Sequence, residues 1–270
     1  MSAYADFQNV LASLDGHVLT MSFNRPAQLN AVNGAIHADL TQILALAAKD
    51  PGVRAIVLRG EGRAFCAGGD VGTMEGSAKP GEGPNHAERV RETLSAAKLV
   101  DEMLAVEVPI VAAVQGYAMG LGATIALLCD VVIMADDAQI ADTHVNIGVV
   151  PGDGGAVLWP LLMTFGAAKW YLMTGERISG AEAVRLGLAL KSVPADKLAD
   201  EAHAHAVKLA KLAPMAVKGT KTTLNKIIRE RINLVLDTGL LLEGACFISD
   251  DHKEAISAFQ AKRPGTFTGR

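Results

Sequence analysis

The feature that most constrains this chain is a repeated local plan, in which an apolar strand-like segment leads through a glycine-rich turn towards a helix. The plan occupies residues 55–70, 109–130 and 131–162. The strands expected within it are residues 55–58, 110–114 and 131–135, all short apolar runs. Because strands that alternate with helices assemble into one layered sheet, the recurrence predicts stacked turns of a single α/β design rather than separate domains.

The segments around the first repeat extend this pattern. Residues 16–24 alternate apolar and polar side chains and predict a strand, and residues 33–49 carry apolar side chains at helical spacing. Residues 71–88 are rich in glycine, proline and charge, and form either a mobile loop or a frayed helix start before the helical spacing of residues 89–104.

The last third of the chain, from about residue 181, predicts helices separated by short proline-containing breaks. Leucines nearly encircle the last long helix, at positions Leu234, Leu236, Leu240, Leu241 and Leu242. A helix that is apolar all round needs cover on all sides, so we expect this helix to be buried in an oligomer.

Charge and composition exclude several classes of protein. With 25 basic and 29 acidic side chains spread along the chain, there is no basic stripe of the kind that binds nucleic acid. Half of the residues are apolar, which argues against disorder. The N-terminal residues lack a secretory pattern, and no apolar run is long enough to cross a bilayer. We therefore expect a soluble cytoplasmic enzyme with no membrane partner.

Cysteines and histidines give no metal site. Cys66, Cys129 and Cys246 lie too far apart in the sequence for a zinc pair and are expected to be free thiols. His203 and His205 lie two residues apart on an expected helix and therefore point to different faces. The remaining isolated histidines are expected at the surface, and they are His17, His37, His86 and His252.

Two glycine-rich turns could carry chemistry, at Gly68–Gly69 and at Gly120–Gly122. Each delivers a strand to the start of a helix, where backbone N–H groups have no intrahelical acceptor and an anion is favoured. If the two turns converge they form an oxyanion hole, although either turn by itself could simply permit a tight strand-to-helix connection. A dinucleotide site is disfavoured because no G-x-G-x-x-G follows the first strand, and neither a G-x-S-x-G elbow nor a Walker motif is present.

Five segments together resemble the enoyl-CoA hydratase/isomerase, or crotonase, family. They are NRPAQLNAVN at 24–33, AFCAGGD at 64–70, PIVAAVQGYAMGLGATIALLCD at 109–130, IGVVPGDGG at 147–155 and LMTGERISGAEAVRLGL at 172–188. The resemblance implies an α/β, crotonase-type spiral of ββα turns with a C-terminal helical trimerisation region. Residues 1–197 would form the spiral core with an acyl-CoA cleft, and residues 198–270 the helical oligomerisation region of a homotrimer or a hexamer made of two trimers.

The resemblance also implies where the ligand binds. The thioester oxygen would lie between the N–H groups of Gly69 and Leu121, and no tightly bound cofactor is implied beyond the coenzyme A of the substrate. The adenine of coenzyme A would lie near the backbone of Ala27, Leu29 and Ala67. The C-terminal segment AFQAKR would place Phe259 and Lys262 beside the nucleotide, often that of a neighbouring subunit, and lysine suits a phosphate.

The chain departs from the family at the two catalytic glutamates, whose positions are occupied by Thr124 and His144. Asp153 is the carboxylate that we expect to act instead, as a buried base or acid with a raised pKa, or else to cap the following helix. His144 could relay a proton or be held by hydrogen-bonded packing, and Thr124 could orient a water or fill space. Asp70 is expected to cap a helix after the glycines, and Cys66 to pack in the core.

The resulting hypothesis is an enzyme acting on an acyl-CoA thioester through an oxyanion-hole-stabilised enolate, with hydration of a 2-enoyl-CoA as the first reading. Because both glutamates are replaced, three alternatives stay open. The same cleft could serve a double-bond isomerase, an acyl-CoA hydrolase or decarboxylase, or a non-catalytic acyl-CoA binding protein.

Overall fold

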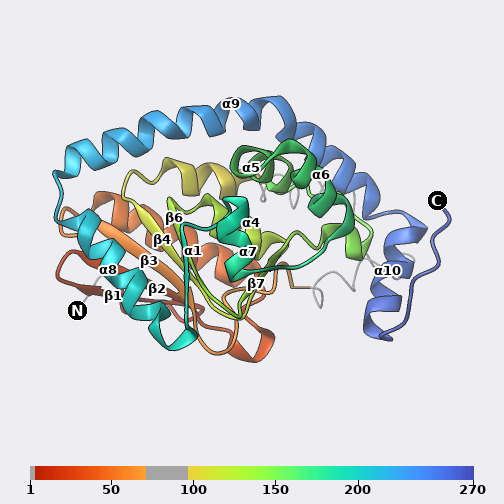
Figure 1. Cartoon of the computed structure of the whole chain (residues 1–270), viewed down its shortest axis with the longest axis horizontal. Helices are drawn as coiled ribbons and strands as arrows, with labels where there is room; N and C mark the ends of the chain where they lie inside the picture. The colour runs from red at the N-terminus through yellow and green to blue at the C-terminus, as the bar shows by residue number, and fades with distance from the viewer. Residues whose placement is uncertain (1–3, 71–96) are drawn as a thin grey trace.

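The computed structural model describes residues 4–70 and 97–270 of the chain (Figure 1). The expected loop or helix start at 71–88, the beginning of the expected helix 89–104 and His86 lie outside the described residues. Residues 97–105 are helical, which confirms the second half of that helix.

A six-stranded sheet runs through the middle of the molecule. Its order is β1 (Val10–Asp15), β2 (Val18–Phe23), β3 (Ala55–Gly60), β4 (Ile110–Val114), β6 (Val131–Ala135) and β9 (Lys191–Val193). The pair β1–β2 is antiparallel and the other pairs are parallel. The central strand β4 is buried along its whole length, as expected for a parallel strand covered on both faces.

A second, smaller sheet contains β5 (Tyr117–Met119), β7 (Gln139–Ala141) and β8 (Ile178–Ser179). Two isolated bridges continue the pairing towards earlier segments: Cys66 pairs with Ala118 of β5, and Val32 pairs with Gly69. The chain passes from β4 in the large sheet to β5 in the small one, and then from β6 to β7. This alternation is the stacking of similar turns that the repeated sequence plan predicts, and it brings the ends of successive turns side by side.

Helices pack around the two sheets (Figure 1). They are α1 (Gly34–Lys49), α4 (Leu121–Leu128), α5 (Gly155–Leu162), α6 (Phe165–Thr174), α7 (Gly180–Leu186), α8 (Leu198–Ala210), α9 (Pro214–Cys246) and α10 (Asp250–Gln260), with 3-10 turns η1 (Pro26–Gln28), η3 (His144–Ile147) and η4 (Ala195–Lys197). The helix α8 packs on the large sheet, whereas α9 crosses over α5 and α10 packs against η3. Asn33 caps α1 by accepting the N–H of Ile36 at 3.0 Å.

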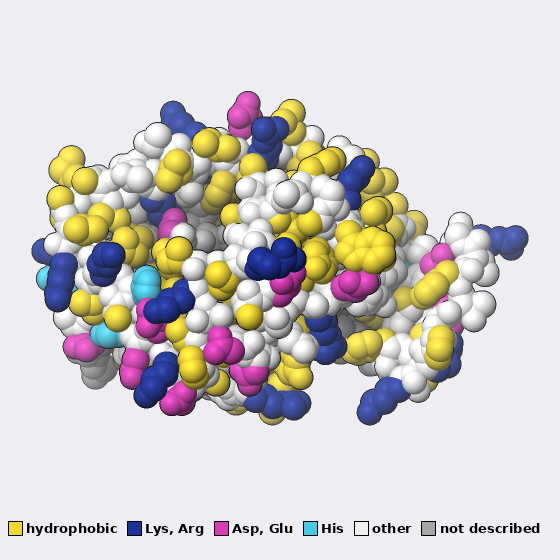
Figure 2. Space-filling model, in the orientation of Figure 1, with side chains coloured by type: hydrophobic (Ala, Val, Ile, Leu, Met, Phe, Trp, Pro, Cys, Tyr) yellow, Lys and Arg dark blue, Asp and Glu magenta, His cyan; other side chains and the backbone are white. Residues whose placement is uncertain are grey.

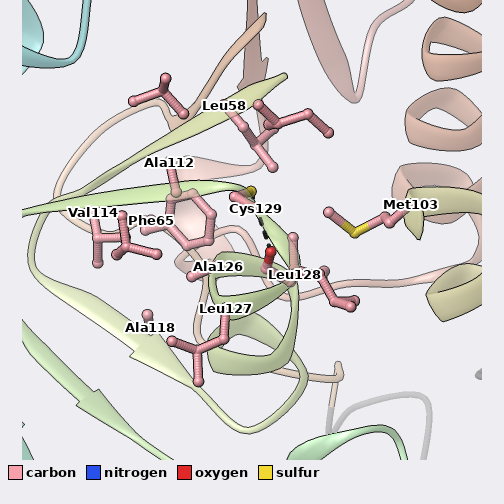
Figure 3. Close-up of a cluster of buried hydrophobic side chains, with 14 of the residues drawn as sticks. Leu58, Phe65, Met103, Ala112, Val114, Ala118, Ala126, Leu127, Leu128 and Cys129 are labelled. Carbon is pink, nitrogen blue, oxygen red and sulfur yellow. Dashed lines mark hydrogen bonds between the residues drawn. The ribbon is translucent and has the colours of Figure 1, made fainter. Parts of the chain in front are cut away.

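The hydrophobic core lies around α4, whose residues from Gly122 to Leu128 are all buried (Figure 3). Phe65 is fully buried there and stacks edge to face on Phe23, with ring centroids 5.5 Å apart. Burial of one such ring contributes about 1.5–3 kcal/mol. Cys129 lies in the same cluster and donates to the carbonyl of Ile125. The core therefore fixes the position of α4, whose first turn carries one of the two glycine motifs.

The surface expectation for His252 is wrong. Its side chain is 3% exposed, Nδ1 lies 2.6 Å from the carbonyl oxygen of Ile147, and the ring packs edge to face on Phe247. This histidine therefore holds α10 against η3. His37 is half-buried rather than exposed, whereas His17 is exposed as expected.

In the described part of the chain, no single helix is long and apolar enough to span a membrane, although the bent pair α9–α10 passes that test by length and composition.

Candidate active site

The two glycine-rich turns converge, as required for an oxyanion hole. The Cys66 N–H donates to the Tyr117 carbonyl at 2.9 Å, and the Met119 N–H donates to the Cys66 carbonyl at 3.0 Å. Gly68 has a φ of +102°, and a β-carbon at this position would lie 2.9 Å from the Met119 carbonyl oxygen. Only glycine allows both this left-handed backbone and this close approach.

The amides of Gly69 and Leu121 are both left without an acceptor among the described residues. Around Gly69, the bridge to Val32 uses the Gly68 carbonyl and the Asp70 N–H, at 2.8 and 3.0 Å. Leu121 is the first residue of α4, and the first intrahelical bond of α4 is made by Thr124 N–H to the Gly120 carbonyl. A helix N-terminus with unused N–H groups favours a partial negative charge.

The structure brings Thr124, His144 and Asp153 together in one buried chain of hydrogen bonds. Thr124, one turn after Leu121 on α4, donates its hydroxyl to Asp153 Oδ1 at 2.9 Å. Asp153 Oδ2 lies 3.1 Å from His144 Nε2. The exposed fractions are 1% for Thr124, 8% for His144 and 4% for Asp153, so the hydrogen bonds between these side chains are shielded from water.

Asp142 is a fourth member of this hydrogen-bonded group, and it was not expected from the sequence. It is fully buried, and its Oδ1 lies 2.6 Å from His144 Nδ1, on the opposite side of the imidazole from Asp153. The only sequence signal was an aspartate two residues before the histidine. With a carboxylate at each ring nitrogen, both nitrogens of His144 act as donors, and the ring is an imidazolium.

The charges of these hydrogen-bonded side chains shift the pKa values of His144 and Asp153 in opposite directions. Burial by itself lowers the pKa of His144, but the nearby Asp153 and Asp142 carboxylates outweigh it and raise that pKa well above its ordinary value. Burial likewise opposes ionisation of Asp153, but the charge of His144 and hydrogen bonds from His144, Thr124 and the Gly155 amide lower its pKa.

The expectation of a raised pKa at Asp153 is therefore wrong. A raised pKa requires a buried carboxylate with few partners, whereas the two oxygens of Asp153 accept from His144 and Thr124 and its charge is balanced. Gly154, the residue before α5, has no side chain with which to cap that helix, but the Gly155 amide in its first turn helps to lower the pKa of Asp153, as expected for a capping carboxylate. Asp153 is thus an ionised partner of His144.

The residues expected near coenzyme A fall into two groups. Ala27, Leu29 and Ala67 lie on adjoining segments, since the Ala67 N–H donates to the Leu29 carbonyl at 3.0 Å and Ala27 belongs to η1. Phe259 is 62% exposed near the end of α10, and Lys262 follows that helix. No hydrogen bond or ion pair of the described residues joins these two residues to the first group.

Asp70 and Cys66 flank the first turn. Asp70 Oδ2 forms an ion pair with Arg25 Nη1 at 2.9 Å, and the helix that Asp70 was expected to cap lies outside the described residues. Cys66 is fully buried, and burial raises the pKa of its thiol to about 12, so it packs in the core as expected and is no nucleophile. Across residues 4–70 and 97–270 no group of three or more His, Cys, Asp or Glu side chains could hold a metal ion.

The sequence and the fold are both similar to those of known proteins. The family model described as enoyl-CoA hydratase/isomerase matches residues 14–270. A short-chain-enoyl-CoA hydratase from Clostridium acetobutylicum is 32% identical over 263 residues, covering 96% of this chain and 97% of the relative. An (E)-benzylidenesuccinyl-CoA hydratase from Thauera aromatica is 34% identical over 272 residues, which cover 96% of this chain and 99% of the relative. The crystal structure of an enoyl-CoA hydratase/isomerase from Mycobacterium paratuberculosis superposes with a TM-score of 0.85 at 37% identity, covering 93% of this chain and 98% of that one.

Proposed function

The chain belongs to the enoyl-CoA hydratase/isomerase family and has its crotonase fold, and we propose that it adds water to the double bond of a 2-enoyl-CoA. The observation that carries this proposal is the pair of unused amides, Gly69 and Leu121, on two turns that touch each other. In the proposed reaction they hold the thioester oxygen. As electrons move from the double bond onto that oxygen, these fixed dipoles stabilise the developing enolate, and each donor is worth about 3–4 kcal/mol of barrier.

Thr124 and His144 have a different part in this proposal from the glutamates that they replace. His144 is bound on both sides by aspartates, so its proton is not available at neutral pH. Its positive charge lies close to the second turn, because a β-carbon on Gly120 would be 3.9 Å from His144 Nε2. We propose that the imidazolium contributes to the positive potential beside the enolate oxygen, while Thr124 and Asp153 hold the ring in place.

Purified protein incubated with 2-enoyl-CoAs of increasing chain length is expected to remove their conjugated absorbance without releasing free CoA. The measurement is ultraviolet absorbance, combined with a thiol assay and mass spectrometry of the product. Release of free CoA would indicate a hydrolase, and loss of CO2 from a carboxyacyl-CoA would indicate a decarboxylase. Tight binding of the whole panel with no product would contradict the proposal and leave a non-catalytic acyl-CoA binding protein.

A double-bond isomerase is the second candidate, and one observation favours it. Moving a double bond needs a single group that takes a proton from one carbon and returns it to another, whereas the two glutamate positions that serve hydration are Thr124 and His144 here. A 3-enoyl-CoA separates the two activities, because isomerisation creates conjugated absorbance and hydration of a 2-enoyl-CoA removes it.

We also propose that residues 198–270 form the oligomerisation region of a trimer or hexamer. The outer side of α9 carries apolar side chains that this chain alone leaves exposed, including Leu234 at 62% and Leu241 at 73%. Hydrophobic side chains are visible along this upper edge of the molecule (Figure 2). Sedimentation equilibrium is expected to give three or six times the chain mass of 28.2 kDa, and replacement of both leucines by glutamate to lower it. A wild-type protein that sediments as a monomer at micromolar concentration would contradict this assignment.

A further inference from the structure

Glu243, on α9, is a buried carboxyl group that the proposed mechanism has not used. Its side chain is 8% exposed, and no hydrogen bond or ion pair joins its carboxylate to another described residue. The other acidic groups of the site differ from it, because Asp142 and Asp153 each bind His144. An acid that is buried without a partner costs free energy to keep, and such groups concentrate at functional sites.

The position of Glu243 follows from a close crossing of α9 over the turn that contains Asp153. A β-carbon on Gly152 would lie 2.8 Å from the Gly239 carbonyl oxygen and 2.5 Å from Glu243 Oε2. The carboxyl group therefore rests on the backbone of the residue immediately before Asp153. It is close enough to interact with the charges of Asp153, His144 and Asp142, although it lies on a helix about 90 residues further along the sequence.

The surroundings of Glu243 favour its protonated form at neutral pH. Burial contributes most, the negative charges of Asp153 and Asp142 add to it, and the positive charge of His144 opposes it, so that the pKa of Glu243 is raised to about 8. The pKa of Asp153 is shifted the opposite way. Neighbouring carboxyl groups whose pKa values are pushed apart are the pattern of an acid and a charge-stabilising group in one site.

We propose that Glu243 is the residue that exchanges a proton with the α-carbon of the acyl-CoA, in place of the glutamates that Thr124 and His144 replace. The inference rests on the proposed function and deepens it by naming the acid. As the oxygen of water bonds to the β-carbon, the electrons of the double bond move to the thioester oxygen between Gly69 and Leu121. The enolate then takes the Glu243 proton at the α-carbon, and the excess proton of the added water returns to the Glu243 carboxylate.

The test compares Glu243→Gln with Asp237→Asn, an exposed carboxyl on the same helix that serves as the control. Two readouts are used: hydration of crotonyl-CoA, and uptake of deuterium from D2O at the α-carbon of butyryl-CoA. Glu243→Gln is expected to lower both by roughly 100-fold with KM within about threefold, since acid–base groups contribute 10²–10⁴-fold. Wild-type hydration is expected to fall as the pH rises through about 8, where Glu243 loses its proton, and this alkaline limb of the hydration profile is expected to vanish in the variant.

Glu243→Asp keeps an acid at the position and is expected to retain part of the deuterium exchange and the alkaline limb of the hydration profile. Circular dichroism verifies that each variant is folded. If Glu243→Gln does not fold, the result for Glu243→Asp is the one that tests the inference. Activity and pH profile of Glu243→Gln equal to those of Asp237→Asn would overturn the inference while hydration by the wild type stands. A wild type that exchanges deuterium but hydrates nothing, with exchange lost in Glu243→Gln, would overturn the proposed hydration and keep the inference. A wild type that does neither overturns both.

Discussion

Replacing Asp153 by alanine is expected to lower the free energy of unfolding at pH 6 by about 3–5 kcal/mol. The change removes a carboxylate that lies 3.1 Å from His144 Nε2 and accepts the Thr124 hydroxyl at 2.9 Å. A buried imidazolium then keeps only Asp142 as its counter-charge, and a buried hydroxyl loses its acceptor. Urea denaturation followed by circular dichroism measures the difference.

The matched control is Asp196→Ala, which removes the exposed aspartate of an ion pair with Lys197. Its expected cost is below about 1 kcal/mol, because exposed ion pairs contribute little. In a double-mutant cycle, His144→Ala combined with Asp153→Ala should cost less than the sum of the single changes, since the second change removes a charge that the first left unpaired. Strict additivity of the two changes would show that the pair does not act as a unit.

The free energy of unfolding that is lost in Asp153→Ala should depend on pH in a defined direction. The lowered pKa of Asp153 gives stability that is present above its unfolded value of 3.8 and is lost as the pH falls through the folded value. The raised pKa of His144 gives stability that is complete below its unfolded value of 6.5 and is lost as the pH rises through the folded value. The difference between wild type and Asp153→Ala is therefore expected to be largest between about pH 4 and 6.5. A difference that grows steadily towards alkaline pH would contradict the ion pair.

Gly122→Ala is expected to reduce kcat by roughly 100-fold, the cost of losing one oxyanion-hole donor. Its β-carbon would lie 2.4 Å from the Cys66 carbonyl oxygen and 2.9 Å from Cys66 Sγ, so the two turns must separate. Separation moves the Leu121 amide away from the Gly69 amide. Overpacking of this kind also lowers stability, by about 1–3 kcal/mol.

Gly34→Ala provides the control for this change. Gly34 also lies in the first turn of a helix, at the start of α1, and a β-carbon there meets nothing within 4 Å. Its expected effect on kcat is nil and its effect on stability is within about 0.5 kcal/mol. Steady-state kinetics and thermal unfolding of both variants decide the matter, and equal kcat values for the two would show that the contact between the turns does not position the reacting groups.

Much of the fold could be predicted because it depends on local patterns. The expected strands at 55–58, 110–114 and 131–135 and the expected helix at 33–49 are confirmed, since each is a buried run or an amphipathic stretch bounded by turn residues. The strand β1 was missed. It pairs on one side only, and of its residues only Val10 is buried, so its sequence lacks the period of a covered strand.

The site could be predicted only in part, because its electrostatics depend on contacts between distant segments. The sequence indicated Thr124, His144 and Asp153 through their positions in family motifs, but not that Asp142 and Asp153 would bind opposite nitrogens of one imidazole. The sequence gives only a weak indication that Glu243 is buried, because this acid directly follows the leucines at 240–242. Its placement depends on where α9 crosses the spiral, which no local pattern encodes.

The crossing of α9 at Gly152 has a consequence for protein synthesis. The large sheet and both glycine turns are complete once residue 193 has been made, yet the segment that meets Gly152 leaves the ribosome later. His252 follows later still before it can bind the Ile147 carbonyl. The contact between α9 and Gly152 therefore forms only after the strands and turns beneath it have been synthesised, and it is among the last contacts of the fold that a growing chain can make.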